Sequence, residues 1–278
     1  MRAGEITLEA MGEGHLDGAL RLSREAGWPH RREDWALVLS VSDGLVATAD
    51  GALAGTAMTT CFDDRVAAVN MVIVDAAMRG RGLGRRLMEA ALRRAGARSC
   101  RLVATAEGLP LYEKLGFAAT GEIVQQQGIA RAVAEPAGVD RARPDDFARI
   151  AGLDAAARGF RREAVMRALN RHARFAVIRE RGTVEAFAAL RRFGRGSVIG
   201  PVVARSHGEA LRLLDALLAG EAGTFVRVDT DEAAGLGPAL AERGLFPAGG
   251  GVAMRRGSAP APSDAPYRPF ALASQALG

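Results

Sequence analysis

The sequence predicts an α/β (α+β) chain made of two halves with the same order of strands and helices, and three observations support this. Short apolar runs bounded by turn residues alternate with stretches of helical apolar spacing. A glycine-rich turn at 79–84 follows an apolar strand and opens a helix. The order of elements over 5–117 then recurs over 139–246. At 278 residues, the chain is long enough for one large or two ordinary domains.

The first half begins with a predicted strand over 5–11 and a helix over 14–26, followed by a second helix over 33–41. Two strands then flank the turn Asp50-Gly51, a pair typical of β-hairpins. In order, the remaining elements expected in this half are strands over 45–48, 53–62 and 66–74, a helix over 83–95, a strand over 101–105, a helix around Tyr112 and a strand over 118–124.

A strand over 130–134 and the segment Glu135-Pro136-Ala137-Gly138 predict the boundary between the halves, which gives domains 1–135 and 136–278. The elements expected in the second half are strands over 139–143, 174–179, 184–193, 197–204 and 225–229, with helices over 144–152, 160–170 and 209–219. The tail 257–269, rich in Pro, Ser and Ala, is expected to be irregular, with 270–272 packing back on the domain.

The segment 79–86 (Arg-Gly-Arg-Gly-Leu-Gly-Arg-Arg) predicts a pyrophosphate site. Glycines let the backbone approach a ligand closely, and the first amides of a helix are free to bind an anion. A dinucleotide loop would need GxGxxG and a nucleoside-triphosphate loop Gly-Lys-Ser/Thr, and neither is present; the chain's one lysine is Lys114. Taken alone, this segment also fits a basic helix N-terminus that binds nothing.

A second motif, Leu-Tyr-Glu-Lys-Leu-Gly-Phe at 111–117, follows an apolar strand at 102–104. Together the two motifs resemble, in order and spacing, the acyl-CoA loop (Arg-x-x-Gly-x-Gly, from Arg79) and the Tyr-containing helix of the GNAT superfamily of N-acyltransferases. The resemblance covers residues 5 to about 130. Ala76 stands where the family often has a proline that shapes a turn.

The resemblance implies two GNAT-like domains, each with a mixed, mostly antiparallel central sheet flanked by helices. It also implies that an amine attacks bound acetyl-CoA directly, through a tetrahedral intermediate that backbone amides stabilise. Tyr112 matches the tyrosine thought to protonate the leaving thiolate; the alternative is a packed aromatic side chain. The residues implied to bind the co-substrate are Met71, Val72, Ile73, Val74, Arg79, Gly80, Arg81, Gly82, Leu83, Gly84, Arg85 and Arg86.

The residues on the side of the amine acceptor are less defined. In this superfamily the loop between the first two helices borders the acceptor pocket, which makes candidates of Trp28, His30, Glu33 and Asp34. Asn70 and Glu107, which are expected near the cleft, are two further candidates for the general base. Glu33 and Asp34 also fit ordinary helix capping, and the tryptophans fit packing of a helix pair. The general base, the acceptor (a small-molecule or a protein amine) and the oligomeric state, a homodimer included, stay open.

The second half is expected to have lost both the acyl-CoA loop and the equivalent of Tyr112. A shift of 129 residues places Val74 on Val203 and Phe117 on Phe246, but Tyr112 on Ala241. The same shift places Arg79, Gly82 and Gly84 on Gly208, Leu211 and Leu213. A degenerate GNAT-like half would complete the acceptor pocket or form an interface.

The composition gives little support for nucleic-acid binding, a membrane span or a metal site. The net charge of +5 comes almost wholly from arginine, and with 5% aromatic residues it gives weak support for a nucleic-acid modifier. No apolar run approaches the ~18 residues of a membrane span and no signal region is evident, so a cytoplasmic protein is expected. Cys61 and Cys100 have no zinc spacing, and no metal is expected. The alternative to an enzyme is a CoA-binding sensor or regulatory module without catalysis.

Overall fold

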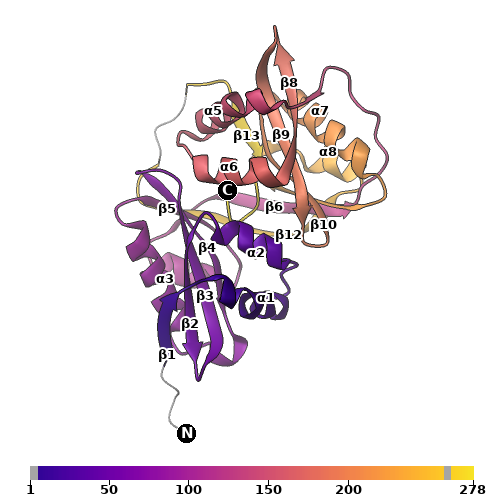
Figure 1. Cartoon of the computed structure of the whole chain (residues 1–278). Coiled ribbons are helices and arrows are strands. Elements are labelled where there is room, and N and C mark those ends of the chain that lie inside the picture. Colours follow the sequence, from indigo (N-terminus) through magenta and orange to yellow (C-terminus); the bar gives the residue numbers. More distant parts are fainter. Residues whose placement is uncertain (1–5, 260–263) are drawn as a thin grey trace.

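The computed structural model describes residues 6–259 and 264–278. Two halves meet end to end, and the C-terminus lies between them (Figure 1). A single sheet runs through both halves in the order β1-β2-β3-β4-β5-β12-β6-β11-β10-β9-β8-β7, and β13 pairs with β10 outside this path. The prediction of a mixed, mostly antiparallel sheet flanked by helices is confirmed, because only β4–β5 and β10–β11 pair in parallel.

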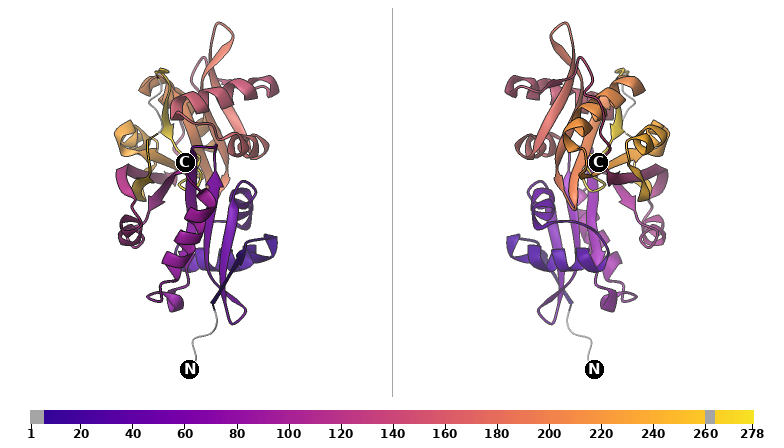
Figure 2. Two further views of the ribbon diagram at one scale, coloured as in Figure 1. Left: turned by 90° about the vertical axis from the view of Figure 1, so that its left-hand side faces the viewer. Right: turned by 90° about the vertical axis from the view of Figure 1, so that its right-hand side faces the viewer.

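The first half follows the predicted order, and its 66–74 strand and 83–95 helix have the predicted bounds. Its elements are β1 (Ile6–Ala10), η1 (Glu13–His15), α1 (Leu16–Glu25), α2 (Arg32–Leu39), β2 (Asp43–Ala49), β3 (Ala52–Cys61), β4 (Val66–Val74), η2 (Ala76–Met78), α3 (Leu83–Ala95), β5 (Ser99–Ala104), α4 (Leu109–Lys114) and β6 (Ala118–Ile129). Helices α1 and α2 cover one face of the sheet and α3 the other (Figure 2).

The second half repeats this order. Its elements are β7 (Asp140–Arg141), η3 (Pro144–Asp146), α5 (Phe147–Arg158), α6 (Glu163–His172), β8 (Ala173–Glu180), β9 (Thr183–Phe193), β10 (Gly196–Ala204), α7 (His207–Leu218), η4 (Ala219–Glu221), β11 (Phe225–Asp231), η5 (Glu232–Ala234), α8 (Gly237–Glu242), β12 (Phe246–Arg256) and β13 (Arg268–Ala271). Alternate residues of β8 face α5 and α6 on one side and α7 on the other.

The two halves exchange strands where they meet. Strand β12 lies between β5 and β6, and β6 lies between β12 and β11 (Figure 1). Met254 of β12 pairs with Leu102 of β5, and Val228 of β11 pairs with Gln126 of β6. Each half therefore supplies a strand that the other half's sheet needs, and backbone hydrogen bonds cross the predicted boundary at 135 in both directions.

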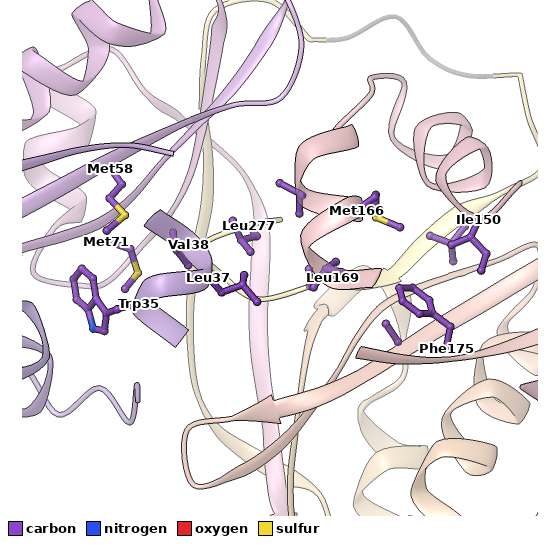
Figure 3. Close-up of a cluster of buried hydrophobic side chains, with 14 of the residues drawn as sticks. Trp35, Leu37, Val38, Met58, Met71, Ile150, Met166, Leu169, Phe175 and Leu277 are labelled. Carbon is purple, nitrogen blue, oxygen red and sulfur yellow. The ribbon is translucent and has the colours of Figure 1, made fainter. Parts of the chain in front are cut away.

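A shared core also joins the halves. One buried cluster runs from Trp35 and Met58 in the first half to Met166 and Phe175 in the second, with Leu277 of the C-terminal segment between them (Figure 3). Burial of large apolar side chains is the main favourable term in folding and association. The interface between the halves is thus part of the protein's interior.

Four sequence predictions need correction. Residues 130–134 form no strand: the Ala130 and Arg131 amides bond to the carbonyls of Thr224 and Arg243 in loops of the second half. Strand β6 continues past 124 to Ile129, because its polar glutamines are paired on both sides. Helix α5 passes Gly152 and ends at Gly159, whose φ of 74° suits a helix C-terminus.

The fourth correction concerns the tail. Arg268 and Pro269, the end of the segment predicted to be irregular, begin strand β13, and Phe270 packs back on the second half as expected, with 4% exposure. The part of the predicted irregular tail at 260–263 lies outside the described residues. Strand β12 had no predicted counterpart, because glycines at 249–251 interrupt its apolar pattern.

Candidate active site

Strands β4 and β5 pair at one end and separate at the other. Their parallel register covers Val66–Ser99, Ala67–Cys100 and Ala68–Arg101, and stops there. On its other side β4 shifts register against β3 between Thr56 and Met58, where Met71 has a φ of 51°. The Thr56 hydroxyl holds this bulge by donating to the Met71 carbonyl at 2.7 Å. The second part of β4, residues 71–74, therefore has no strand partner in β5.

The glycine-rich segment 75–82 connects β4 to α3. Gly80 and Gly82 both have a φ of 75°, and the space beside each Cα is open. Gly82 is the N-cap of α3, so no side chain caps the helix, and its first amides are left for an external partner. Gly84 packs against Val74 and Leu111, which places the helix N-terminus beside the end of β4.

Four arginines surround this N-terminus. Arg79 and Arg81 are exposed and form no hydrogen bond or ion pair within the described part of the chain, although the charge of Arg79 acts on Glu107. Arg85 pairs with Glu89, and Arg86 donates to the Ile6 carbonyl. Free helix amides and excess positive charge together favour an anion such as pyrophosphate.

A cavity of about 330 Å³ lies where the separated strands meet the second half. Met71, Val72 and Tyr112, predicted from sequence, line one part of it. Residues of both halves and of the C-terminal segment complete the lining: Gly27, Trp28, Pro29, His30, Val69, Asn70, Leu102, Val103, Thr105, Gln125, Gln127, Phe193, Arg195, Arg227, Ala248, Gly250, Ser274, Gln275 and Ala276.

Tyr112 of α4 lies in a mostly apolar position. Its ring packs edge-on against Phe117, with centroids 6.2 Å apart, and its hydroxyl has no hydrogen-bond partner among the described residues. Burial raises the pKa of Tyr112 to about 12. The phenol is therefore protonated at neutral pH and has a proton available to donate.

Two of the four acceptor-side candidates line the cavity, Trp28 and His30. The His30 ring lies edge-on to the rings of Trp28 and Phe193, and its Nδ1 is 3.1 Å from the Ser23 hydroxyl. Burial, together with the positive charges of Arg227 and Arg191, lowers the pKa of His30 to about 4, despite an opposing effect of Asp34. His30 is thus neutral at physiological pH.

The other two candidates do not line the cavity. Glu33 is exposed on the first turn of α2. Asp34 is buried and accepts hydrogen bonds from Arg31 and from the Gly194 amide, and it is 3.5 Å from Arg191. Although burial opposes ionisation, these hydrogen bonds hold the pKa of Asp34 below its ordinary value. Its visible role is to tie α2 to the β9–β10 hairpin of the second half.

Of the two further candidates for the general base, one lines the cavity and the other does not. Glu107 is exposed on the loop before α4 and lies outside the cavity lining. Asn70 lines the cavity, and its Nδ2 donates to the Thr60 hydroxyl at 2.8 Å and to the Ala276 carbonyl at 2.9 Å. Its Oδ1 is buried with no partner. An asparagine is not basic, so Asn70 can hold a polar group of a ligand but cannot take its proton.

Sequence reasoning missed the second-half side chains of the lining, among them Phe193, Arg195 and Arg227, as well as the C-terminal residues Ser274 and Gln275. No local pattern marks them, because strand exchange and the return of the C-terminus bring them to the cavity. Only the polar run Gln125-Gln126-Gln127 within an apolar region offered a signal.

The corresponding junction of the second half is filled by the chain itself. Strands β10 and β11 also separate, after Ile199–Val228, but β13 pairs with β10 from Val202 to Ala204. Only Arg205 and Ser206 connect β10 to α7. The predicted equivalents of the first-half loop residues, Gly208, Leu211 and Leu213, therefore lie inside α7, which corrects the simple shift.

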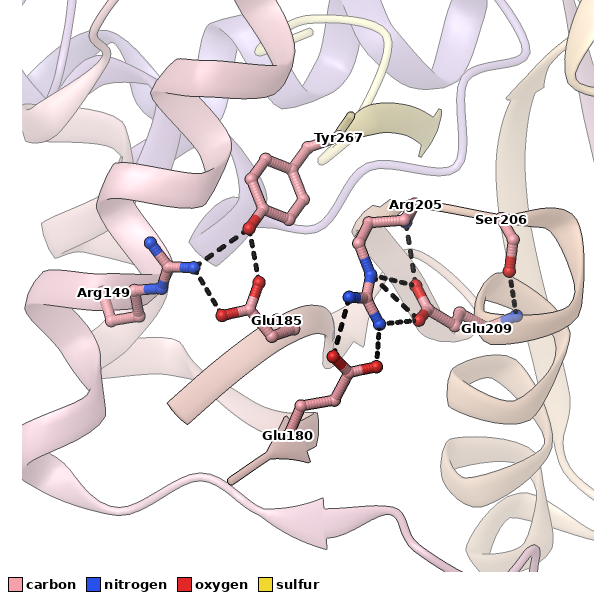
Figure 4. A network of polar contacts seen from close by, with 7 residues as sticks. All are labelled: Arg149, Glu180, Glu185, Arg205, Ser206, Glu209 and Tyr267. Carbon is pink, nitrogen blue, oxygen red and sulfur yellow. Dashed lines mark hydrogen bonds and ion pairs between the residues drawn. The ribbon is translucent and has the colours of Figure 1, made fainter. Parts of the chain in front are cut away.

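Side chains also occupy the N-terminus of α7. The Ser206 hydroxyl accepts from the Glu209 amide, and the Glu209 carboxylate accepts from the Arg205 amide (Figure 4). The Arg205 side chain binds both Glu209 and Glu180. One of the first amides of α7 is thus capped by Ser206, and a carboxylate of the protein binds the amide just before this cap, so side chains of the chain itself satisfy part of this helix N-terminus.

Within the described ranges, no group of three or more His, Cys, Asp or Glu side chains could hold a metal ion. No helix in this part of the chain is long and apolar enough to cross a membrane.

A sheet with two separated parallel strands, a bulged strand β4 and a glycine loop that opens a helix defines the acetyltransferase fold of the GNAT type. Family models described as acetyltransferase (GNAT) domains match residues 41–119 and 150–267. The chain is 30% identical to an uncharacterised N-acetyltransferase of Bacillus subtilis, YitH, over 78% of its own length and 79% of that protein. It therefore belongs to the GNAT acetyltransferase family and carries two GNAT domains, as the sequence motifs predicted.

Solved structures show the same fold. A candidate acetyltransferase from Pyrococcus horikoshii superposes with a TM-score of 0.83 at 20% identity, covering 98% of this chain and 96% of that one. A tandem GNAT protein from the clavulanic acid biosynthesis pathway gives 0.62 at 18% identity, covering 94% and 100%. A GCN5-related N-acetyltransferase from Sphaerobacter thermophilus gives 0.65 at 18% identity, covering 90% and 95%.

Proposed function

We propose that this protein transfers an acetyl group from acetyl-CoA to an amine, and that only the first half binds acetyl-CoA. The observation that supports this most directly is the cavity in which the bulge at Met71 and Val72 and the unpartnered hydroxyl of Tyr112 lie together. The open loop 75–82 directly follows the C-terminal end of the same strand, three residues beyond the bulge. A pantetheine arm along 71–74 would join these two places, with the pyrophosphate at the N-terminus of α3.

In this proposal the acyl carbonyl lies at the bulge, where backbone amides stabilise the developing oxyanion. The amine nitrogen forms a bond to the carbonyl carbon, and the carbon–sulfur bond then breaks. Tyr112 donates its proton to the departing thiolate. His30 has too low a pKa to be an efficient base at neutral pH, so water in the cavity takes the proton that the amine loses.

The second half supplies the acceptor side of the cavity in this proposal. Phe193, Arg195 and Arg227 face the first-half strands across the cavity. The junction between β10 and α7 in the second half is filled by β13 and by Glu209. This supports the view that the second half completes the site of the first half and does not catalyse a second reaction.

Substitution of Gly82 by glutamate tests the proposal. A carboxylate there would occupy the proposed phosphate position and repel the pyrophosphate of acetyl-CoA from the helix N-terminus. We therefore expect acetyl-CoA affinity to fall by roughly 100-fold or more. Because Gly82 has a left-handed φ, Gly82→Ala carries the same backbone strain without the charge and is the matched control. Gly208→Glu, in α7 of the second half, is the control for a new charge on the other domain.

Calorimetric titration with acetyl-CoA separates the variants. Equal affinity in Gly82→Glu and Gly82→Ala would overturn the assignment of the loop. Release of free CoA thiol with a panel of amines then distinguishes an enzyme from a CoA-binding module, which would bind acetyl-CoA without turnover.

A further inference from the structure

The cavity has an uneven distribution of charge. Its lining contains two arginines, Arg195 and Arg227, and no aspartate or glutamate. Arg195 stands at the β9–β10 turn, exposed, with its guanidinium 4.7 Å from the centre of the Phe225 ring. Among the described residues it has no carboxylate partner. One full positive charge at this side of the cavity is therefore uncompensated.

Arg227 is held rigidly on β11. It is 7% exposed, and Asp229 binds its Nε at 3.0 Å and its Nη2 at 2.9 Å. Gln275 of the C-terminal segment also donates to Asp229, so this carboxylate is hydrogen-bonded by both Arg227 and Gln275. The Nη1 of Arg227 has no partner in the part of the chain that the structure describes, and its face packs over Phe193 with the guanidinium 5.2 Å from the ring centre.

The lining contributed by β4 offers a complementary group for an amine. The Oδ1 of Asn70 is buried and has no hydrogen-bond partner among the residues that the structure describes, while its Nδ2 donates to the Thr60 hydroxyl and the Ala276 carbonyl. An unsatisfied buried acceptor is costly unless a ligand supplies the donor, and an amine N–H is such a donor. Asn70 precedes Met71, where the proposed acyl carbonyl lies.

We propose that the acceptor is a small amine that carries a carboxylate, bound through its carboxylate by Arg195 and Arg227 and through its amine beside Asn70. This inference rests on the proposed acetyl transfer and specifies its acceptor. A planar guanidinium matches a carboxylate geometrically, and a cavity of about 330 Å³ fits an acceptor of amino-acid size. Polycationic acceptors such as polyamines or aminoglycosides would meet two guanidinium groups, of which that of Arg195 has no carboxylate partner among the described residues, and no carboxylate among the lining residues.

The test compares amino acids with their own carboxamides, which keep the amine and lose the negative charge. For the intact protein with saturating acetyl-CoA, we expect kcat/KM to favour the acids by roughly 10- to 100-fold, the usual range for a charge-assisted hydrogen bond. Arg195→Gln should remove most of this preference. Arg192→Gln, a neighbouring exposed arginine outside the lining, is the matched control and should keep it.

Arg195 is chosen because its removal leaves no buried group unpaired, whereas loss of Arg227 would strand Asp229 and could unfold the protein. Binding of unreacted acids, measured by calorimetry on the CoA-bound protein, gives a second readout that should weaken in Arg195→Gln. A phosphorylated small amine is the third substrate tested. A higher kcat/KM for it than for the amino acids would overturn the choice of a carboxylate.

Equal use of acids and amides, or a preference for polyamines, would overturn the inference while acetyl transfer itself stands. A protein that binds acetyl-CoA and acetylates no amine would instead overturn the proposed function, and the acceptor assignment with it.

Discussion

The two halves share one fold but differ at the junction between their fourth strand and the following helix. In the first half, β4 separates from β5, and the open loop 75–82 leaves α3 uncapped. In the second half, β13 pairs along β10, and Ser206 and Glu209 cap α7 after a connection of only two residues. The comparison shows that a GNAT junction can be closed by the chain itself, and this difference supports the proposal that only the first half binds the co-substrate.

The largest expected effect comes from removing the second half. A chain ending at Ala134 would lack β12, the neighbour of both β5 and β6, and would lose half of the shared core. We expect it to be insoluble or to lack cooperative melting in circular dichroism, because unpaired strand edges and exposed apolar surface favour aggregation. A soluble fragment with a sharp melting transition and an unchanged acceptor KM would show that the halves are independent.

The next effect concerns the strand that fills the second junction. Phe270 of β13 is 4% exposed, and Phe270→Ala should lower the free energy of unfolding by about 3–5 kcal/mol through loss of apolar contacts. Phe246→Ala makes the same chemical change at a side chain that is 50% exposed, and should cost less than about 1 kcal/mol. Urea denaturation measures both. Similar small losses would mean that β13 contributes little to the second half.

Acid should weaken the wall that the first half contributes to the cavity. The pKa of His30 is lowered from 6.5 to about 4, chiefly by burial, so the unfolded chain binds a proton between these values while the folded chain does not. Stability is therefore complete above about pH 7 and falls as the pH drops from 6.5 to 4, by up to about 3 kcal/mol.

Denaturation midpoints at pH 4.5 to 7 test this, with His30→Gln expected to flatten the dependence. His172→Gln changes an exposed histidine of α6 and should leave the slope as it is. If His30→Gln kept the full slope, other groups would be responsible for the acid sensitivity.

The smallest effect in free energy separates the two tyrosines, one in each half. Tyr112→Phe should lower kcat about 100-fold, equivalent to about 2.7 kcal/mol, with acetyl-CoA affinity unchanged, because the hydroxyl is assigned to the leaving thiolate. Tyr267→Phe removes a hydroxyl that binds Arg149 and Glu185 in the second half, and should leave kcat within about two-fold (Figure 4). Wild-type turnover in Tyr112→Phe would make Tyr112 a packing residue only.

Much of the fold could be predicted from sequence because its signals are local. Strand 66–74, helix 83–95 and the hairpin turn at Asp50-Gly51 follow from apolar spacing and from a glycine that adopts a left-handed conformation. The predicted co-substrate loop and Tyr112 lie beside each other because neighbouring elements of one half carry them. Their roles stay predictions, whereas the GNAT family and its two domains are confirmed by the matched relatives.

The sequence by itself therefore determined most of the elements, though not β12, together with the repeat and the motifs that are typical of the family. Only the tertiary structure decided which side chains share the cavity, because β6, β12 and the C-terminal segment reach it through pairing with distant parts of the chain. Arg195 and Gln275 carry no local mark in the sequence. Asp34, which the family resemblance made a candidate, is instead hydrogen-bonded by the Arg31 side chain and the Gly194 amide. Periodicity reports which face of an element is buried, but it does not report which distant strand or carboxylate will meet that face.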